Sequence, residues 1–272
     1  MTGTLAIKFY KYFEIVKITY NNNTTYIGDT LGFGGLVAMR VWIFVQLYRL
    51  AFDTIGASQI GGLNLAQTIW ILALAQCFHV SNRTRKIMKQ IDYEVKTGNV
   101  ANAMVKPYNY VLFYFYSCFG VIGGNLFVTV FFTILTSLLV VGSVPVGVIG
   151  ITAGILLLFL GFVLNNLAIL IVGMLGFWTE SIDAYRWIYD KFLWILGGIF
   201  LPLTIFPDKI QTIVELLPFN HMFYGPARIM IDFSPAVFIK YLAIQVAWII
   251  IFSIILNFVY RKGTKNLSIN GG

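Results

Sequence analysis

The chain has 272 residues, of which 58% are hydrophobic and 11% are charged, and its formal net charge is +8. Soluble domains carry roughly 25% charged residues, so this composition excludes a soluble enzyme and a disordered chain and predicts an all-α integral membrane protein. The net charge does not indicate nucleic-acid binding, because the basic residues flank apolar runs instead of forming one surface. Cys77 and Cys118 lie within apolar runs, so no disulfide framework is expected.

Residues 5–20 predict an amphipathic helix. Lys8, Lys11, Glu14 and Lys17 recur every three positions and leave about half of the helix circumference to apolar side chains. These charges also exclude the uninterrupted apolar core of a cleavable signal peptide. We expect this helix to lie in the headgroup region of a membrane, within an interfacial segment 1–28. An ordinary amphipathic surface helix is the alternative.

Six apolar runs approach the roughly 20 helical residues that a membrane span needs. They are predicted at 31–52, 63–81, 109–141, 146–177, 192–206 and 237–260. The third and fourth exceed one span, so we expect them to tilt or to project beyond the lipid. The fifth is too short alone and runs into Pro202 and Pro207, which break helices, so it is predicted to be a broken span.

The Lys and Arg residues are distributed unequally between the two predicted faces of the membrane. Fourteen lie on the side of the two chain ends and of the connectors 82–107 and 178–191, whereas three, Lys209, Arg228 and Lys240, lie on the other. Because cytoplasmic loops carry the excess of basic residues, both termini are predicted to be cytoplasmic. We therefore expect one multi-pass domain over 1–272 in a prokaryotic cell membrane, with spans 1–2 in 29–81, spans 3–5 in 108–206, and span 6 with a cytoplasmic tail in 237–272.

Residues 82–107 form the predicted cytoplasmic connector between spans two and three. Ile87, Ile91 and Val95 repeat every four residues and predict a short helix with one apolar stripe. Gly98 suits the left-handed position that ends such a helix, and Pro107 stops a second short helix. We expect the first helix to lie parallel to the membrane, with its apolar side covered by a partner protein or, alternatively, by anionic lipid.

Segment 207–236 contains two predicted half-length helices that face outward. Apolar residues follow helical spacing from Ile210 to Leu217, up to Pro218, and a second helix from Pro226 to Ile231 follows a Tyr-Gly-Pro turn. Irregular backbone at membrane depth must be buried in protein or line a wet cavity, so we interpret the segment as re-entrant. The predicted outer gate comprises the residues at which these elements break, namely Pro202, Pro207, Pro218 and Phe219.

Several polar residues fall within the predicted spans. The main ones are Arg40, Gln46, Asn125, Asn165 and Asn166. They either hold helices together through interhelical hydrogen bonds or line a substrate path, and the sequence leaves both interpretations open. Gly120, Gly123 and Gly124 form a small-residue face, which predicts close helix packing.

The sequence lacks the motifs of several chemistries. No phosphate-binding GxxxxGK[ST] loop, HExxH or GxSxG is present. The two histidines, His79 and His221, are far apart in sequence and neither has a partner at metal-ligand spacing. We therefore expect this chain to hold no cofactor and no metal, and not to be an enzyme by itself.

Two stretches resemble one family. Residues 91–107, with acidic residues and Gly98 ahead of Lys106-Pro107, resemble the connector of ABC-2 type exporter permeases. Residues 197–219 resemble the broken fifth span and outer re-entrant helices of the same family. Together they cover roughly a quarter of the chain, and the similarity is greatest to six-span permeases found beside a second, related permease and an ATPase.

This resemblance implies six spans, an N-terminal elbow helix, and a coupling helix between spans two and three. It implies two permeases, the second a related paralogue or another copy, each docked on an ATPase subunit that binds ATP and Mg. It implies ATPase contacts at Ile91, Asp92, Tyr93, Glu94, Val95, Gly98 and Asn99. The expected function is outward transport by alternating access.

Two other functions fit the sequence. An ATP-independent secondary transporter or channel would use Arg40, Arg49 and the intramembrane amides, although residues 1–140 and 141–272 show no internal repeat of the kind that many such carriers have. A membrane anchor or assembly subunit is the third interpretation. The substrate is not indicated, because aromatic residues suit an amphipathic cargo but also pack ordinary helices.

Overall fold

The computed structural model describes residues 2–24, 27–56, 58–82, 84–144, 146–203 and 206–270. Arg83 and the side chain of Lys8, both counted above among the basic residues, lie outside this description. Within it the regular structure is helical, and strand-like pairing is confined to one isolated bridge between Ile60 and Leu63. The predicted all-α class is confirmed.

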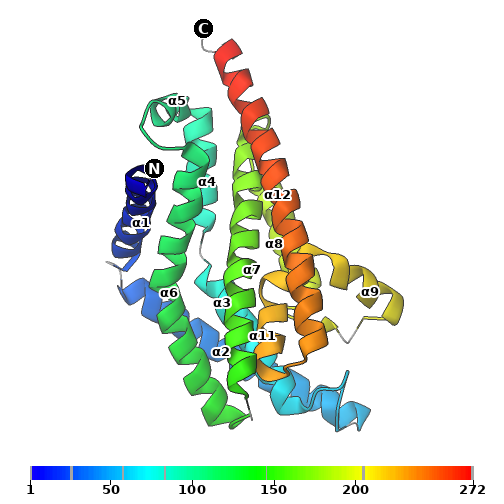
Figure 1. Ribbon diagram of the computed structural model, residues 1–272. Helices are drawn as coiled ribbons and strands as arrows, with labels where there is room; N and C mark the ends of the chain where they lie inside the picture. Colours follow the sequence, from blue (N-terminus) through cyan, green and yellow to red (C-terminus); the bar gives the residue numbers. More distant parts are fainter. Residues whose placement is uncertain are drawn as a thin grey trace.

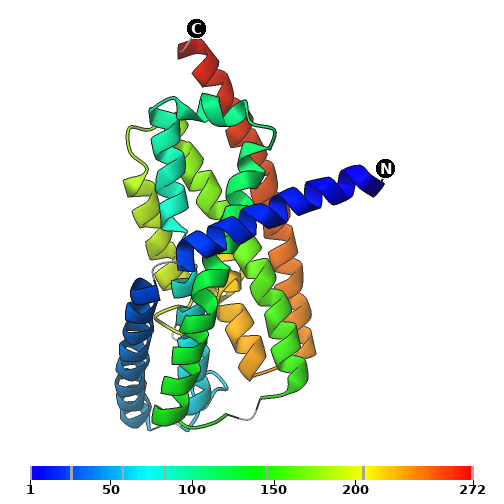
Figure 2. The same cartoon turned by 90° about the vertical axis from the view of Figure 1, so that its left-hand side faces the viewer.

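The helices at the centre of the molecule run along its long axis, and several others lie across it (Figures 1 and 2). In chain order they are α1 (Thr2–Thr24), α2 (Ile27–Ile55), α3 (Leu65–Ser81), α4 (Arg85–Lys96), α5 (Asn99–Met104), α6 (Tyr110–Val140), α7 (Val148–Met174), the 3-10 turn η1 (Leu175–Phe177), α8 (Asp183–Leu196), α9 (Asp208–Leu216), α10 (Pro218–Met222), α11 (Tyr224–Ile231) and α12 (Pro235–Asn270). Figure 1 shows α4 and α5 at the end of the molecule that carries the C-terminal part of α12. We call this the connector end.

Four helices of the described chain are long and apolar enough to cross a membrane. They are Gly34–Ile55, Tyr110–Val140, Val148–Phe177 and Pro235–Lys265, and they coincide with four of the predicted spans. The predicted second span corresponds to α3, which has 17 residues and is shorter than the roughly 20 that a straight crossing needs. A multi-pass membrane protein is therefore supported, while the number of six spans stays a prediction.

The region of the predicted fifth span differs from its prediction. Its helix, α8, covers Asp183–Leu196, so the bounds 192–206 are wrong. The helix stops at Gly197 and Gly198, and Gly198 adopts φ of +67°, a left-handed conformation that favours glycine. Pro202 follows and prevents resumption of the helix at that point.

Helix α1 crosses the side of α6 (Figure 2). A Cβ at Gly120 of α6 would lie 2.6 Å from the carbonyl oxygen of Val16 and 2.6 Å from the Cβ of Thr19, so only glycine permits this approach. Gly123 also faces α1, at 3.5 Å from the ring of Tyr20. The close helix packing predicted for these glycines is confirmed, and its partner is the N-terminal helix.

The segment formed by α10 and α11 packs along α7, which is the most apolar of the described helices. A Cβ at Gly161 would overlap the carbonyl oxygen of Met222, and one at Gly150 would lie 3.0 Å from that of Ile229. Glycines at one face of α7 therefore let the backbone of a second element lie against it. This contact buries α10 and most of α11 inside the molecule.

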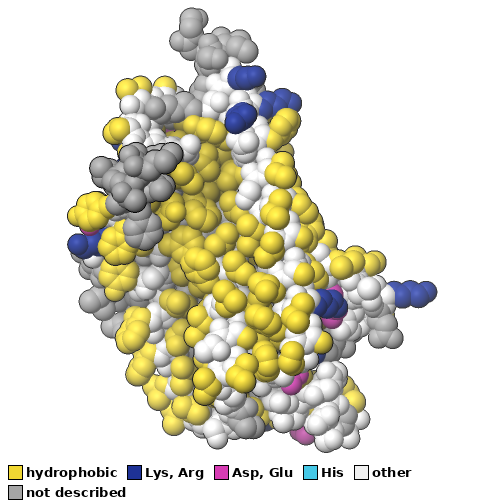
Figure 3. Space-filling model, viewed as in Figure 1, with side chains coloured by type: hydrophobic (Ala, Val, Ile, Leu, Met, Phe, Trp, Pro, Cys, Tyr) yellow, Lys and Arg dark blue, Asp and Glu magenta, His cyan; other side chains and the backbone are white. Residues whose placement is uncertain are grey.

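Apolar side chains cover much of the surface over α6, α7 and α12 (Figure 3). Large exposed examples are Phe127 and Phe131 on α6, Phe159 on α7, and Ile254 and Phe258 on α12. A soluble monomer rarely exposes an apolar surface of this extent. Lipid or another membrane subunit is therefore the natural surrounding of these helices.

Candidate functional site

The connector between α3 and α6 folds into two helices, as the sequence predicted. α4 ends at Lys96, Gly98 follows Thr97 with φ of +72°, and α5 ends before Pro107. The left-handed position predicted for Gly98 is confirmed. However, Figures 1 and 2 show α4 aligned with the long helices and only α5 lying across the connector end, so the orientation predicted for the first connector helix is wrong.

The chain itself covers the apolar stripe of α4. Ile87, Met88, Ile91 and Val95 are buried, and Ile91 lies against Gly173 of α7, where an added Cβ would meet its side chain at 3.4 Å. The prediction that a partner protein or lipid covers this stripe is therefore wrong, because α7 and η1 already occupy that side. A partner of α4 would meet its opposite, polar face.

Glu94 joins α4 to α6. Its carboxylate accepts hydrogen bonds from the hydroxyls of Tyr110 at 3.0 Å and Tyr114 at 2.6 Å, and from the amide of Gln90 at 2.9 Å. Hydrogen bonds to a charged acceptor are worth about 1.5–3 kcal/mol each. Both carboxylate oxygens are thus engaged within the chain, and they attach α4 to the first turns of α6.

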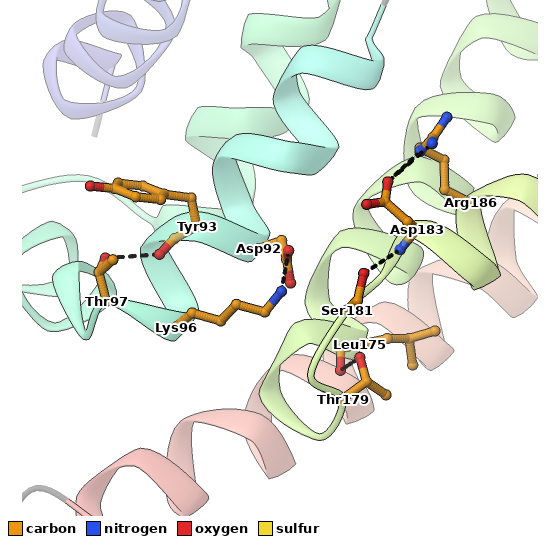
Figure 4. A network of polar contacts seen from close by, with 9 residues as sticks. All are labelled: Asp92, Tyr93, Lys96, Thr97, Leu175, Thr179, Ser181, Asp183 and Arg186. Carbon is orange, nitrogen blue, oxygen red and sulfur yellow. Dashed lines mark hydrogen bonds and ion pairs between the residues drawn. The ribbon is translucent and has the colours of Figure 1, made fainter.

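Asp92 lies on the side of α4 that faces η1. Its Oδ1 atom lies 2.7 Å from the place that a Cβ at Gly176 would take, so glycine at this position lets the two elements approach closely. Its Oδ2 atom accepts an ion-paired hydrogen bond from Lys96, one helical turn along (Figure 4). Asp92 therefore fixes α4 against the end of α7.

The seven predicted ATPase contacts divide into two groups. Tyr93, Gly98 and Asn99 are exposed, with 58% of Tyr93 accessible. The other four, which are Ile91, Asp92, Glu94 and Val95, are buried or half-buried and pack or bond within the chain. The accessible face of α4 is therefore polar apart from the Tyr93 ring.

The structure pairs some of the predicted intramembrane polar residues and separates others. Arg40 donates to Oε1 of Gln76 at 3.0 Å, and Gln76 donates in turn to the carbonyl of Ile199 at 3.3 Å. Gln46 is exposed on the far side of α2 and joins none of the other predicted polar residues. Arg40 and Gln46 therefore do not share one path within this chain.

The buried asparagines connect different helices. Asn125 accepts from Asn23 of α1 at 3.1 Å and donates to the carbonyl of Ser81 at the end of α3. Asn165 of α7 accepts a 2.6 Å hydrogen bond from Tyr189 of α8. The buried side chain of Asn166 has no partner among the described residues. Asn125 and Asn165 thus serve as interhelical contacts.

The predicted outer gate residues lie around α9 and α10. Pro218 is buried at the start of α10, Pro202 is buried, Pro207 is exposed before α9, and the ring of Phe219 packs on Phe192 at 5.4 Å. The predicted break at Pro218 is confirmed, and the second helix begins slightly earlier than predicted, at Tyr224. The role of these residues as a gate stays a prediction.

Helix α12 holds this segment in place. The side-chain amide of Gln245 donates to the carbonyls of His221 at 2.6 Å and Leu157 at 2.9 Å, and so joins three elements. Lys240 bonds the carboxylate of Glu215 at 2.7 Å. These contacts fix α9 and α10 to the first half of α12.

A family model described as "ABC-2 family transporter protein" matches residues 36–271. This match covers most of the chain. The chain belongs to the ABC-2 transporter family. The resemblance stated from the connector and the broken span is confirmed, and the comparison with curated proteins finds no match. An ABC-2 membrane protein is a permease subunit, and such permeases normally work with an ATPase.

A charged cluster that was not predicted from the sequence lies beside the connector of this ABC-2 permease. Arg186 bonds the carboxylate of Asp183 at 3.0 Å, and Arg85 of α4 pairs with Asp190 of α8 at 3.1 Å (the first pair is drawn in Figure 4). The hydrogen bond from Arg186 lowers the pKa of Asp183. The spacing of Asp183, Arg186 and Asp190 places these residues on one helical face, and this spacing could have predicted the cluster. Among the described residues, no group of three His, Cys, Asp or Glu side chains could hold a metal ion.

Proposed function

We propose that the chain is the permease subunit of an ATP-driven exporter whose ATPase docks on the α4–α5 connector. The observation that carries this proposal is the attachment of α4 to two long helices, through Glu94 to α6 and through Ile91 to α7. An ATPase that binds the exposed face of α4 and changes its position therefore also moves α6 and α7, which run through the molecule. ATP and Mg belong to the ATPase.

The mechanism follows from a shift between two conformations. ATP binding brings the two ATPases together, the connectors move with them, and the permeases change from inward-open to outward-open. The nucleotide drives this shift only through its higher affinity for one of the two states. Tyr93 and Asn99 are the proposed docking residues, because they are exposed on the connector.

The proposed membrane position uses α1 as the marker of the inner surface. From Gly120, which lies under α1, to Val140, α6 rises about 30 Å, which equals the hydrocarbon thickness of a bilayer. The first part of α6, with α4 and α5, then projects beyond the lipid. The excess of basic residues at this end favours a cytoplasmic location for it and for both termini, in a cell membrane.

A second permease, either a paralogue or another copy, completes the proposed transporter. Supporting this, α2 exposes Gln46 among Trp42, Ile43 and Leu47. An amide facing hydrocarbon without a partner is unfavourable, and a neighbouring permease would cover it.

The proposal is tested by purifying the tagged chain from its native membrane in a mild detergent. We expect an ATP-binding subunit to co-purify and the complex to hydrolyse ATP. Replacing Tyr93→Ala should release the ATPase, whereas Tyr10→Ala, an equally exposed tyrosine on α1, should retain it. Repeated isolation of the chain alone, with ion flux in vesicles, would favour the secondary transporter or channel. Isolation alone without any flux would favour the anchor.

A further inference from the structure

A cavity of about 430 Å³ lies between α2, the turn from α3 to α4, and α8. Its walls bring together three cations, two further polar side chains and one indole ring, from Arg40, Arg85, Lys86, His79, Asn82 and Trp194. None of these residues is one of the proposed docking residues, Tyr93 and Asn99. The docking of an ATPase therefore does not account for this cavity.

The cations of this cavity are only partly neutralised. Arg85 pairs with the carboxylate of Asp190 at 3.1 Å. Neither Arg40 nor Lys86 pairs with a carboxylate of the described residues. Arg40 is held instead by the neutral amide of Gln76. A cation at membrane depth is stabilised by a counter-charge or by water. Two of the three cations of this cavity have no such counter-charge among the described residues.

Two polar side chains beside the cavity also have atoms without partners. The Nδ1 atom of His79 and the Nδ2 atom of Asn82 are buried and have no hydrogen-bond partner among the described residues, and each would reach a ligand in the cavity after its side chain turns. The amide of Asn82 can donate, as can Nδ1 of a neutral histidine in one tautomer. Guanidinium, ammonium and amide donors around one space form the donor set that oxyanions with several acceptor oxygens, above all phosphate, bind best.

The cavity lies near the proposed membrane surface. Asn82 follows Ser81, whose carbonyl accepts from Asn125, and Asn125 in turn bonds Asn23 of α1. The apolar wall formed by Leu36, Val80 and Trp194 suits a ligand that has an apolar part next to its charge. The polar and apolar walls together favour a phosphate ester.

We propose that this cavity binds the phosphate group of a lipid or of a soluble phosphate compound. The phosphate oxygens would accept from Arg40 and Lys86 and supply the missing negative charge. Because the site lies within the permease chain alone, this proposal does not depend on an ATPase partner.

The test uses the purified full chain in a neutral sugar detergent, without ATPase. Inorganic phosphate or phosphatidylglycerol is added, with chloride of equal ionic strength as the control, and thermal unfolding and native mass spectrometry report binding. We expect stabilisation by at least one probe beyond chloride. A response to the lipid alone identifies a headgroup, and a response to inorganic phosphate identifies a soluble phosphate ligand.

The variants Arg40→Gln and Lys86→Gln should each weaken binding about tenfold, as expected for loss of one charge-assisted hydrogen bond. Lys89→Gln, an exposed residue of the same helix that does not line the cavity, should leave binding unchanged. Lys86 is exposed, so its variant decides the question even where Arg40→Gln does not fold. Absence of binding by both probes, or equal losses in Lys86→Gln and Lys89→Gln, would overturn the proposal.

Discussion

The hydroxyl of Tyr114 donates a 2.6 Å hydrogen bond to the carboxylate of Glu94, and this contact joins the connector to α6. The two residues lie 20 positions apart in the chain, on different helices. Tyr110 adds a second hydrogen bond to the same carboxylate. This carboxylate is therefore the polar joint between α4 and α6.

Glu94→Lys should uncouple ATP hydrolysis from transport without preventing membrane insertion. The change removes the acceptor of both tyrosine hydroxyls and places a cation beside them, at a cost of about 1.5–3 kcal/mol for each lost hydrogen bond. ATP hydrolysis and transport are measured together in reconstituted vesicles, with Lys17→Glu, at an exposed position of α1, as the charge-changing control. Substrate-stimulated hydrolysis at the level of the unmodified protein would contradict the role of Glu94.

Gly98→Val should also reduce coupling, through the backbone. Gly98 adopts φ of +72°, which a β-branched residue reaches only at a cost of about 1–3 kcal/mol. The turn between α4 and α5 would shift, while the helices on either side would stay intact. Gly98→Asn, which tolerates this conformation better, should retain most of the coupled activity. Equal activity of the valine and asparagine variants would refute the conformational explanation.

Gly161→Val should destabilise the packing of α10 on α7. An added side chain would collide with the backbone at Met222, and such overpacking costs about 1–3 kcal/mol or more. The melting temperature in detergent should fall clearly. Gly35→Ala, at a helical glycine with open space around it, should leave the melting temperature unchanged or raise it slightly. Similar effects at both positions would be inconsistent with the close contact.

The ion pair of Glu215 and Lys240 should make the attachment of α9 depend on pH. Burial acts to raise the pKa of Glu215, but the hydrogen bond and charge of Lys240 outweigh it, so its pKa lies below the ordinary value. A carboxyl with a lowered pKa stabilises the fold above its unfolded pKa of about 4.3, and this contribution is lost as the pH falls further.

Melting curves of the unmodified protein and of Lys240→Gln measure this contribution. The unmodified protein should be the more stable at pH 7, by less than about 1 kcal/mol for a pair this accessible. The difference should shrink as the pH falls below about 4. A difference that does not change with pH would show that the ion pair is not its source.

Local sequence signals predicted the short elements well. Gly98 after an apolar stripe and Pro218 after another marked two helix ends that the structure confirms. Gly120 and Gly123 marked a close helix contact but not its partner, α1. Periodicity describes one helix at a time, so it shows that a face is apolar and does not show what covers it.

Contacts between residues that lie far apart in the chain were not predicted from the sequence. The cover of the α4 stripe by α7 depends on tertiary packing, as does the bond between Glu94 and Tyr114. The start of α8 at Asp183 was missed because its first turns are charged and amphipathic, and a search for apolar runs passes over them. The close contacts of the α7 glycines with α10 and α11 were not predicted, because a glycine within an apolar run does not show which element approaches it.

Cross-linking from the connector tests the docking of the ATPase most directly. The native cysteines, Cys77 and Cys118, are buried, so Lys89→Cys introduces one accessible thiol on the exposed side of α4 and leaves the docking residues Tyr93 and Asn99 in place. Tyr10→Cys provides the control on α1. With a short reagent that joins a thiol to an amine, applied to native membranes, we predict a cross-link from position 89 to an ATP-binding subunit and none from position 10. Accessibility of position 89 only from the outer face of the membrane, or the absence of its cross-link in an intact, ATP-hydrolysing complex, would contradict the account.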